Sequence, residues 1–235
     1  MSTLVKQLAL RSIAAGVQLP DASLGRFQEL ACLKRLLEDL HVNCVLDVGA
    51  NRGQFASEVR GIGFSGQIFS FEPIASEFAQ LQASFAGDAK WKGFQMALGN
   101  ADGETELNVI PGLTVMSSIL EPKSRWPGVH AETVHVRRLD GLWPELAAAI
   151  PDPRVLLKMD TQGFDLNVFS GAAGCLSRIN CMQSELSIVP LYEKMPHYLD
   201  ALRAYEEAGF RLYNMAVVSR TPQGSLQELN CTMVR

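Results

Sequence analysis

The sequence predicts an α/β fold with one mostly parallel sheet, and three observations support this prediction. Short apolar runs of strand length alternate with amphipathic stretches of helix length along most of the chain. Several of these runs end at acidic or glycine-bearing turns, as at 45–53 and 154–163. The last two runs, 210–218 and 226–234, are close enough to form a hairpin, which would reverse one strand. We expect a seven-stranded sheet with one antiparallel strand and helices on both faces.

Length and composition are those of one domain with a substantial core. The chain has 235 residues, of which 47% are hydrophobic and 20% charged, which is ordinary for a globular protein. We expect an α/β domain over 41–235, preceded by a helical extension over 1–40. The formal charge of -4 provides no basic field for a phosphate backbone, so nucleic acid is not expected as a partner. The five cysteines form no Cys-x-x-Cys pair, which predicts reduced thiols and a cytoplasmic protein.

The apolar stretch from Met1 to Val17 is predicted to be neither a signal peptide nor a transmembrane segment. Lys6 and Arg11 interrupt it, and no convincing cleavage site follows. Its apolar residues can share one helical face, which favours a helix packed on the domain or on a second copy in a homo-oligomer over attachment to a membrane surface. The residues of this face are Leu4, Leu8, Ile13 and Val17.

The first half of the domain alternates between helix and strand. Ser23 can cap a helix whose broad apolar stripe extends to Leu40. The run from Cys44 to Val48 has the length and β-branched content of a buried strand, and the apolar spacing after Gln54 predicts a helix. We expect a helix at 76–85 and further strands at 67–71, 91–98 and 104–110.

The second half continues this alternation after an irregular segment. Residues 111–132 contain glycines, prolines and a pair of serines, and a long irregular run in a compact domain is usually functional, so we expect it to cover the site. Residues 133–138 alternate as a strand that can pair with 104–110. We expect strands at 154–160 and 181–189 and helices at 139–150, 164–176 and 198–208.

The turn after the first strand predicts the type of ligand. Gly49 and Gly53 enclose a turn in which Asn51 replaces the middle glycine that a dinucleotide-binding loop needs, and no Gly-Lys-Ser/Thr phosphate loop follows. Asp47 suits a ligand with an ammonium group. Glu72 ends the second strand, where an acidic side chain can bind both hydroxyls of a ribose. A cationic, ribose-bearing cofactor without a diphosphate is indicated, and S-adenosylmethionine fits this description.

Each cofactor residue has a predicted role. The two glycines allow the backbone to approach the amino-acid part of the cofactor, to which Asp47 and Asn51 would hydrogen-bond. Glu72 would bind the ribose, and Pro73 would shape the turn behind it. The predicted cofactor residues from these two turns are Asp47, Gly49, Ala50, Asn51, Gly53, Glu72 and Pro73.

If S-adenosylmethionine donates its methyl group to an oxygen acceptor, the protein must align the two reactants and manage one proton. Lys158 and Asp160 are two positions apart at the end of a strand, so they share one face of the sheet. Asp160 would orient the acceptor hydroxyl or the cofactor ammonium, and Lys158 would pair with it or stabilise developing charge. The alternative is an ion pair that only organises the loop.

The acceptor is expected to contact the loop 190–196 and the irregular segment. Tyr192 and His197 are candidates from the first region and its end, and His130 is a candidate from the second. Asp160, Asp165 and Glu185 could together supply oxygen ligands to a divalent metal, but their spacing does not require one. A metal is therefore possible but not indicated.

Five motifs in order resemble the FkbM family of S-adenosylmethionine-dependent methyltransferases: VLDVGANRGQFA, FSFEP, MALGNADGETELNV, LLKMDTQGFDLNVFSGA and SELSIVPLYEKMPHY. The resemblance covers roughly 40–235 and implies a single Rossmann-like class I methyltransferase domain. It also implies methylation of a hydroxyl group on a sugar, a glycan or another small secondary metabolite, and it places Ala97 near the adenine. The resemblance further places Glu185, at the end of a later strand, beside the site, as a second candidate for binding the hydroxyl or accepting its proton. The family typically has glutamate where this chain has Gln162, which weakens a role for negative charge at that position.

Three alternatives remain open at this point. A nicotinamide-dependent oxidoreductase is disfavoured by the missing middle glycine. A nucleic-acid methyltransferase would show a basic groove and an Asn/Asp-Pro-Pro-aromatic loop, where this chain has Asp160-Thr161-Gln162-Gly163. A non-catalytic, cofactor-binding partner protein would bind the cofactor without turnover, and Gln162 is the one residue that points to it.

Overall fold

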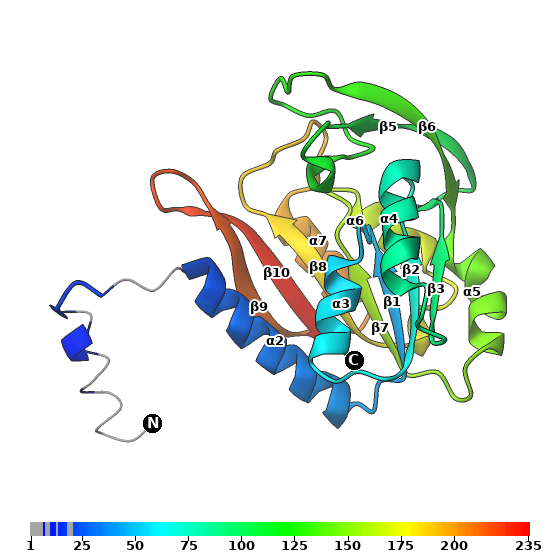
Figure 1. Ribbon diagram of the computed structural model, residues 1–235, viewed down its shortest axis with the longest axis horizontal. Coiled ribbons are helices and arrows are strands. Elements are labelled where there is room, and N and C mark those ends of the chain that lie inside the picture. The colour runs from blue at the N-terminus through cyan, green and yellow to red at the C-terminus, as the bar shows by residue number, and fades with distance from the viewer. Residues whose placement is uncertain (1–6, 8–9, 13, 18–20) are drawn as a thin grey trace.

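The central feature of the fold is a seven-stranded sheet, seen in a computed structural model that describes residues 7, 10–12, 14–17 and 21–235 (Figure 1). From one edge to the other, its strands are β3 (Trp91–Phe94), β2 (Gln67–Phe71), β1 (Cys44–Val48), β7 (Val155–Met159), β8 (Ile179–Ser187), β10 (Leu226–Val234) and β9 (Arg211–Arg220). β10 runs antiparallel to both of its neighbours, and the other neighbouring strands are parallel. The predicted sheet is confirmed.

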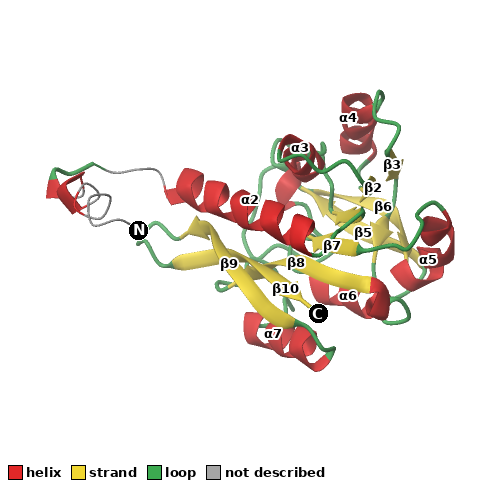
Figure 2. Ribbon diagram, turned by 90° about the horizontal axis from the view of Figure 1, so that it is seen from below, coloured by secondary structure: helices red, strands yellow, loops and turns green. Residues whose placement is uncertain are grey.

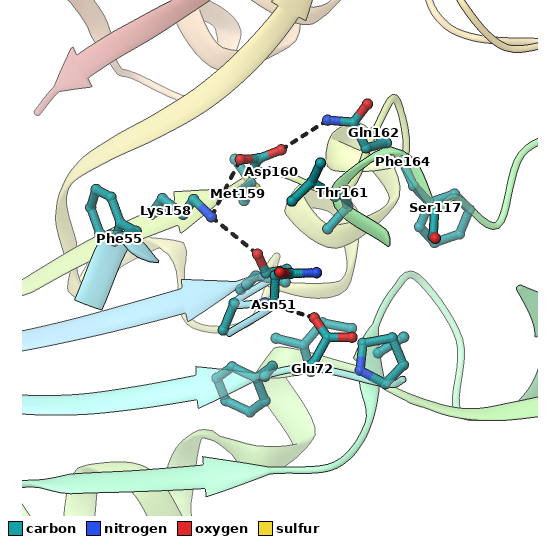
Figure 3. Close-up of a pocket in the computed structure, with 18 of the residues that line it drawn as sticks. Asn51, Phe55, Glu72, Ser117, Lys158, Met159, Asp160, Thr161, Gln162 and Phe164 are labelled. Atoms are coloured by element: carbon teal, nitrogen blue, oxygen red, sulfur yellow. Dashed lines mark hydrogen bonds and ion pairs between the residues drawn. The ribbon is translucent and has the colours of Figure 1, made fainter. Parts of the chain in front are cut away.

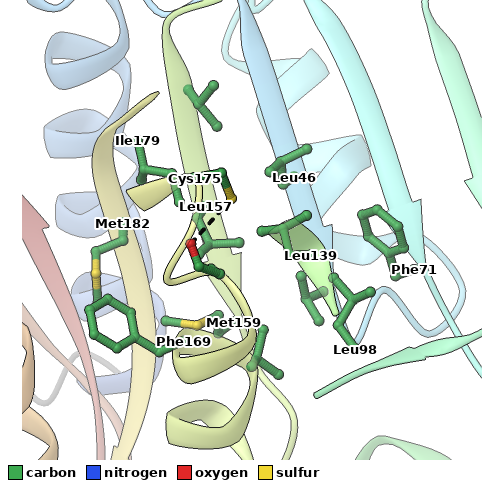
Figure 4. Packing of buried hydrophobic residues seen from close by; sticks show 14 of the residues in the cluster. Leu46, Phe71, Leu98, Leu139, Leu157, Met159, Phe169, Cys175, Ile179 and Met182 are labelled. Carbon is green, nitrogen blue, oxygen red and sulfur yellow. Dashed lines mark hydrogen bonds between the residues drawn. The ribbon is translucent and has the colours of Figure 1, made fainter. Parts of the chain in front are cut away.

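Helices cover both faces of this sheet, as predicted. On one face lie α2 (Asp21–Asp39), α3 (Gln54–Gly61) and α4 (Ala75–Phe85), which bury a cluster that includes Leu36, Phe55 and Leu81. On the other lie α5 (Leu139–Ala148), α6 (Asp165–Gly171) and α7 (Tyr198–Glu207). Figure 4 shows part of the core on this second face, where Leu139 lies near Leu46 and Leu157 of the sheet, and Phe169 lies near Met159 and Met182. Burial of these two apolar layers removes most of the strands from water, which is the main stabilising term.

A second sheet of three strands lies beside the ends of the first. It contains β4 (Ala97–Leu98), β6 (His130–Arg137) and β5 (Gly103–Val109), and β6 pairs antiparallel with β5, as the alternation of residues predicted. In Figure 1 the β5–β6 pair arches over the upper end of the large sheet. A short 3-10 helix, η1 (Thr114–Met116), follows β5, and another, η2 (Leu176–Arg178), precedes β8. The small sheet therefore brings residues of the connecting segment 110–129 close to the strand ends.

Several predicted boundaries were wrong: the helix predicted at 164–176, for example, ends at Gly171, and two further differences have a clear physical reason. The single strand expected at 91–98 is two strands in different sheets, because the chain turns after β3, where the Met96 N–H donates to the Phe94 carbonyl oxygen. The irregular segment was expected to extend to residue 132, but β6 begins at His130, where pairing with Val109 satisfies the backbone. Local composition could not show that β6 extends to His130, because this depends on pairing with β5.

The predicted N-terminal helical face falls mostly outside the described residues, since Leu4, Leu8 and Ile13 are not described. The helix expected from Ser23 begins at Asp21. In the described part of the chain, no helix is both long and apolar enough to cross a bilayer. All five cysteines are free thiols, and Cys44, Cys175, Cys181 and Cys231 are buried.

Candidate active site

A cavity of about 320 Å³ lies at the carboxyl ends of β1, β2 and β7 (Figure 3). This is the edge of an open α/β sheet at which ligands bind, and the volume falls within the usual range for a small-molecule site. Eight of the residues predicted from the sequence line it: Gly49, Ala50, Asn51, Glu72, Pro73, Ala97, Lys158 and Asp160. The structure therefore gathers residues from four separate parts of the chain around one space.

The glycine turn after β1 adopts a conformation that favours the residues found there. Gly49 has φ +75° and Asn51 has φ +46°, which glycine and asparagine tolerate better than other residues. A Cβ atom at Gly49 would lie 2.0 Å from the carbonyl oxygen of Asp160. Glycine is thus required here because the end of β7 presses against the turn, in addition to any approach of a ligand.

Glu72 is anchored at the end of β2 with its carboxylate at the cavity. One carboxylate oxygen accepts a hydrogen bond from the Asn51 N–H and the other accepts one from the Ile74 N–H, both at 2.8 Å. The residue is only 4% exposed, and this burial raises the pKa of its carboxyl group to about 7 despite the two hydrogen bonds. Each oxygen keeps lone-pair capacity for a further donor, such as a ribose hydroxyl.

A buried ion pair lies beneath the glycine turn. The ammonium nitrogen of Lys158 lies 3.3 Å from a carboxylate oxygen of Asp47, which is fully buried, and it donates to the Gly49 carbonyl oxygen at 3.2 Å. It also lies over the ring of Phe55, 5.4 Å from the centroid. Burial lowers the pKa of Lys158, but the carboxylates of Asp47 and Asp160 outweigh it, so the pKa is raised and the side chain stays charged. A charged lysine stabilises carboxylates and does not act as a base.

Asp160 presents its carboxylate to the cavity with both oxygens oriented. One oxygen lies 3.5 Å from the Lys158 ammonium nitrogen, and the other accepts a hydrogen bond of 3.1 Å from the side-chain amide of Gln162 (Figure 3). Its side chain is 38% exposed, whereas those of its two partners are buried. Asp160 is therefore the accessible carboxylate of this group.

Gln162 joins the cavity to Glu185, a role that its departure from the family pattern did not suggest. Its amide nitrogen donates to Asp160 and also to Glu185, the latter at 2.8 Å, and its amide oxygen accepts from the Tyr192 hydroxyl at 3.1 Å. Burial and the nearby carboxylates of Asp160 and Glu228 raise the pKa of Glu185 well above its ordinary value. Glu185 and Tyr192 are not among the residues that line the cavity, and both are hydrogen-bonded to Gln162, which does line it.

The loop after β7 is held by Asp165, the first residue of α6. Its carboxylate accepts hydrogen bonds from the Thr161 N–H at 2.9 Å, from the Ser184 hydroxyl at 2.7 Å and from the Glu185 N–H at 3.1 Å. These bonds tie the ends of β7 and β8 together. The buried Asp165 carboxylate therefore holds the loop in place, although the sequence predicted it as a possible metal ligand.

The structure leaves four further predicted residues away from the cavity. His130 is exposed at the start of β6, where its ring lies near Glu132, and His197 caps α7 by accepting from the Leu199 N–H. Asp47 lies beneath the turn with Lys158. A Cβ atom at Gly53 would lie 2.6 Å from the ring of Phe85, so this glycine serves the packing of α3 on α4.

Sequence reasoning missed the far wall of the cavity, which is lined by Arg26, Glu58, Gln183 and Asn230. These residues come from α2, α3, β8 and β10, and nothing in their local sequence marks them. The register offers one signal, because Gln183 pairs with Lys158 on the adjacent parallel strand and so shares its face of the sheet. Thr114 and Ser117 of the irregular segment also line the cavity, in agreement with the expectation that this segment covers the site.

No group of three or more His, Cys, Asp or Glu side chains is arranged to hold a metal ion in the described residues. Of the three candidate oxygen ligands, Asp165 is used by the loop, and the amide of Gln162 lies between Asp160 and Glu185. An amide nitrogen is a donor and cannot coordinate a cation. Nothing in this geometry indicates a metal.

The strand order, the glycine turn after β1 and the acid that ends β2 define a Rossmann-like methyltransferase fold. A sequence profile described as the methyltransferase FkbM domain matches residues 47–212, which is most of the chain. The protein belongs to the FkbM methyltransferase family, and the resemblance found in its motifs is confirmed.

Solved structures with a similar arrangement are distant in sequence. Magnesium protoporphyrin IX methyltransferase from Synechocystis with bound SAM shares 11% identity, with a TM-score of 0.48 over 93% of this chain and 86% of that chain. A putative RNA methyltransferase from Pyrococcus horikoshii shares 14%, with a TM-score of 0.46 over 88% and 82%. Aeropyrum pernix fibrillarin with natively bound S-adenosyl-L-methionine shares 10%, with a TM-score of 0.45 over 82% and 66%. No curated protein sequence matches the chain. The function is therefore inferred from the family and from the site, and not from these structural similarities.

Proposed function

We propose that this methyltransferase uses S-adenosylmethionine to methylate a hydroxyl group on a sugar, a glycan or another small metabolite. The observation that carries the proposal is the single cavity that joins Glu72 and the glycine turn to the accessible carboxylate of Asp160. The first part suits a ribose-bearing cofactor, and the second suits an acceptor that must lose a proton.

The residues present fit the cofactor. Glu72 offers remaining lone pairs to the ribose hydroxyls, and Gly49 to Asn51 expose backbone groups to its amino-acid part. Ala97, which lines the cavity with Leu98, would lie against the adenine. When bound, S-adenosylmethionine supplies a methyl group already activated by its positive sulfur.

The protein then has to orient the hydroxyl and receive its proton. Asp160, which lines the cavity, would accept a hydrogen bond from the hydroxyl. It would take the proton as the hydroxyl oxygen receives the methyl group, whose bond to sulfur breaks to leave S-adenosylhomocysteine. Gln162 holds one oxygen of the Asp160 carboxylate by a hydrogen bond, and the Lys158 ammonium nitrogen lies 3.5 Å from the other oxygen, so both oxygens keep a fixed position. The proton released from the hydroxyl is thus held at Asp160 until water removes it.

Titration calorimetry with S-adenosylmethionine and S-adenosylhomocysteine, with NAD as the control, tests the cofactor part of the proposal. We expect micromolar affinity for the first two ligands and no binding of NAD. Methyl transfer from labelled S-adenosylmethionine to hydroxylated acceptors tests the rest. Absence of binding by all three ligands would show that the glycine turn is purely structural and would remove the proposal.

Replacing Glu72 should weaken binding of the cofactor and remove the pH dependence of that binding. In Glu72→Gln, loss of the ionised acceptor should cost about 1–3 kcal/mol of affinity for S-adenosylhomocysteine at pH 8. Glutamine keeps an oxygen for one of the two backbone N–H groups that Glu72 satisfies, which makes it a better test than alanine.

The pH dependence follows from the raised pKa of Glu72, which is about 7. The ionised form accepts hydrogen bonds from two hydroxyls, so the affinity of the wild type should be constant above pH 8 and fall by up to about tenfold per pH unit below pH 7. Calorimetry from pH 5.5 to 8.5 should show this fall in the wild type and not in Glu72→Gln. A parallel fall in both proteins would contradict the ribose assignment.

A further inference from the structure

The cavity extends beyond the residues that the cofactor would contact. Glu72, Ala97 and the glycine turn belong to the side of β1 and β2, whereas Gln183 and Asn230 belong to β8 and β10, on the opposite side of β7. Arg26 and Glu58, from α2 and α3, complete this second part of the lining. Asp160, at the end of β7, lies between the two parts, so the second part is next to the carboxylate proposed to receive the proton.

A buried hydrogen-bond network holds the second part in place. Glu29 of α2 is 4% exposed, and one of its oxygens accepts from the side-chain amides of Gln183 at 2.7 Å and Asn230 at 2.8 Å. Its other oxygen accepts from the Arg26 guanidinium at 2.6 Å, and Arg26 in turn forms a two-point ion pair with Glu58. Figure 2 shows α2 running beside β9, and contacts between these two elements hold the helix against the β8–β10–β9 side of the sheet. The site is built on rigid elements, not on loops.

The polar side-chain atoms of this region that remain available to a ligand are mostly hydrogen-bond acceptors. The side-chain oxygens of Gln183 and Asn230 accept no hydrogen bond from any residue that the structure describes, although Gln183 is only 3% exposed. The Arg26 guanidinium is shared between two carboxylates, so the region has one more negative charge than positive charge. An anionic ligand would be repelled, whereas a ligand with several hydroxyl groups could donate to these oxygens.

We propose that the acceptor subsite is formed by Gln183, Asn230, Arg26 and Glu58, and that this subsite selects a neutral, polyhydroxylated ring. This proposal rests on the function proposed above. The amide oxygens and the Glu58 carboxylate accept hydrogen bonds from hydroxyls of the ring that are not methylated, and this places the reacting hydroxyl at Asp160. α2 is therefore part of the active site, since its Arg26 and Glu29 set the positions of the other groups.

The test uses the full chain saturated with S-adenosylhomocysteine and measures glycoside binding by saturation-transfer NMR. The probes are the neutral methyl glycosides of glucose, galactose, mannose and rhamnose, with methyl glucuronide as the anionic counterpart. We expect at least one neutral glycoside to bind and the glucuronide not to bind. In Gln183→Met, the dissociation constant of that glycoside should rise about tenfold, while affinity for S-adenosylhomocysteine by calorimetry stays within about twofold.

Thr232→Val is the matched control, because Thr232 is buried beside Gln183 in the same register and does not line the cavity. It should bind both the glycoside and S-adenosylhomocysteine as the wild type does. Asn230→Ser provides a second test if Gln183→Met fails to fold, and it should raise the glycoside dissociation constant in the same direction.

The results that would overturn the subsite differ from those that would overturn the proposed function. Binding of no neutral glycoside, tighter binding of the glucuronide, or unchanged glycoside affinity in both variants would overturn the subsite alone. A loss of S-adenosylhomocysteine affinity equal to the loss of glycoside affinity would assign these residues to the cofactor. Failure of the wild type to bind S-adenosylhomocysteine would remove the proposed function, and the subsite with it.

Discussion

Asp160→Asn should lower kcat by about 10²–10⁴-fold while leaving the affinity for S-adenosylhomocysteine within about threefold of the wild type. Asparagine has nearly the same shape and can still accept the hydrogen bond from Gln162, but it cannot take a proton from the acceptor. Initial rates of methyl transfer measure the first effect, and calorimetry measures the second.

Two further variants make this result specific. Asp200→Asn replaces an exposed aspartate on α7 and should leave both quantities unchanged. Glu185→Gln, which reaches the cavity only through Gln162, should reduce kcat by less than about tenfold, since it disturbs the position of Asp160 and not its chemistry. A larger loss of kcat in Glu185→Gln than in Asp160→Asn would assign the proton acceptor to Glu185 and the positioning role to Asp160. Equal losses of kcat and of cofactor affinity in Asp160→Asn would show that Asp160 is a cofactor ligand.

Lys158→Met should lower the free energy of unfolding by about 3–5 kcal/mol, the second large effect that we expect. Asp47 is fully buried, and the Lys158 ammonium is its cationic partner at 3.3 Å. Without it, the carboxylate would be ionised in a low-dielectric environment or would have to take up a proton. Urea denaturation of the cofactor-free protein measures the change as a shift of the midpoint at constant m-value.

The double variant Asp47→Asn/Lys158→Met separates the charge effect from the packing effect. Removing both charges should restore most of the lost stability, because a buried ion pair contributes little relative to neutral groups of similar volume. The Ser70 hydroxyl, 3.4 Å from the Asp47 carboxylate, can still donate to the asparagine oxygen. If the double variant were no more stable than Lys158→Met, the loss would come from packing around Phe55 and not from the unpaired charge.

Prediction from the sequence succeeded where a property depends on a few consecutive residues. The strands Cys44–Val48 and Gln67–Phe71 were predicted with their observed bounds, since each is a short apolar run followed by a turn or an acid. The strand predicted at 91–98 was wrong because its division depends on which sheet each half joins. Such a division is decided by partners that are distant in the sequence.

The same contrast holds for the site. Gly49, Glu72 and Asp160 were predicted from their positions after strands, and all three line the cavity, because these strands end at the same edge of the sheet. His130 and His197 were proposed from residue type, and the structure places both outside the cavity. A histidine in a loop carries no information about the direction of its side chain, so residue type was a weaker guide than position at a strand end.

The sequence by itself determined the alternation of strands and helices, the turn at Gly49 and the acids at the strand ends, because these depend on local periodicity and backbone preference. Only the tertiary structure decided that Gln162 bridges Asp160 and Glu185, and that Arg26 and Asn230, 204 positions apart, line one cavity. Those contacts follow from the order of the strands and the path of α2. Such contacts join residues that are distant in the sequence and meet only when the whole chain has folded.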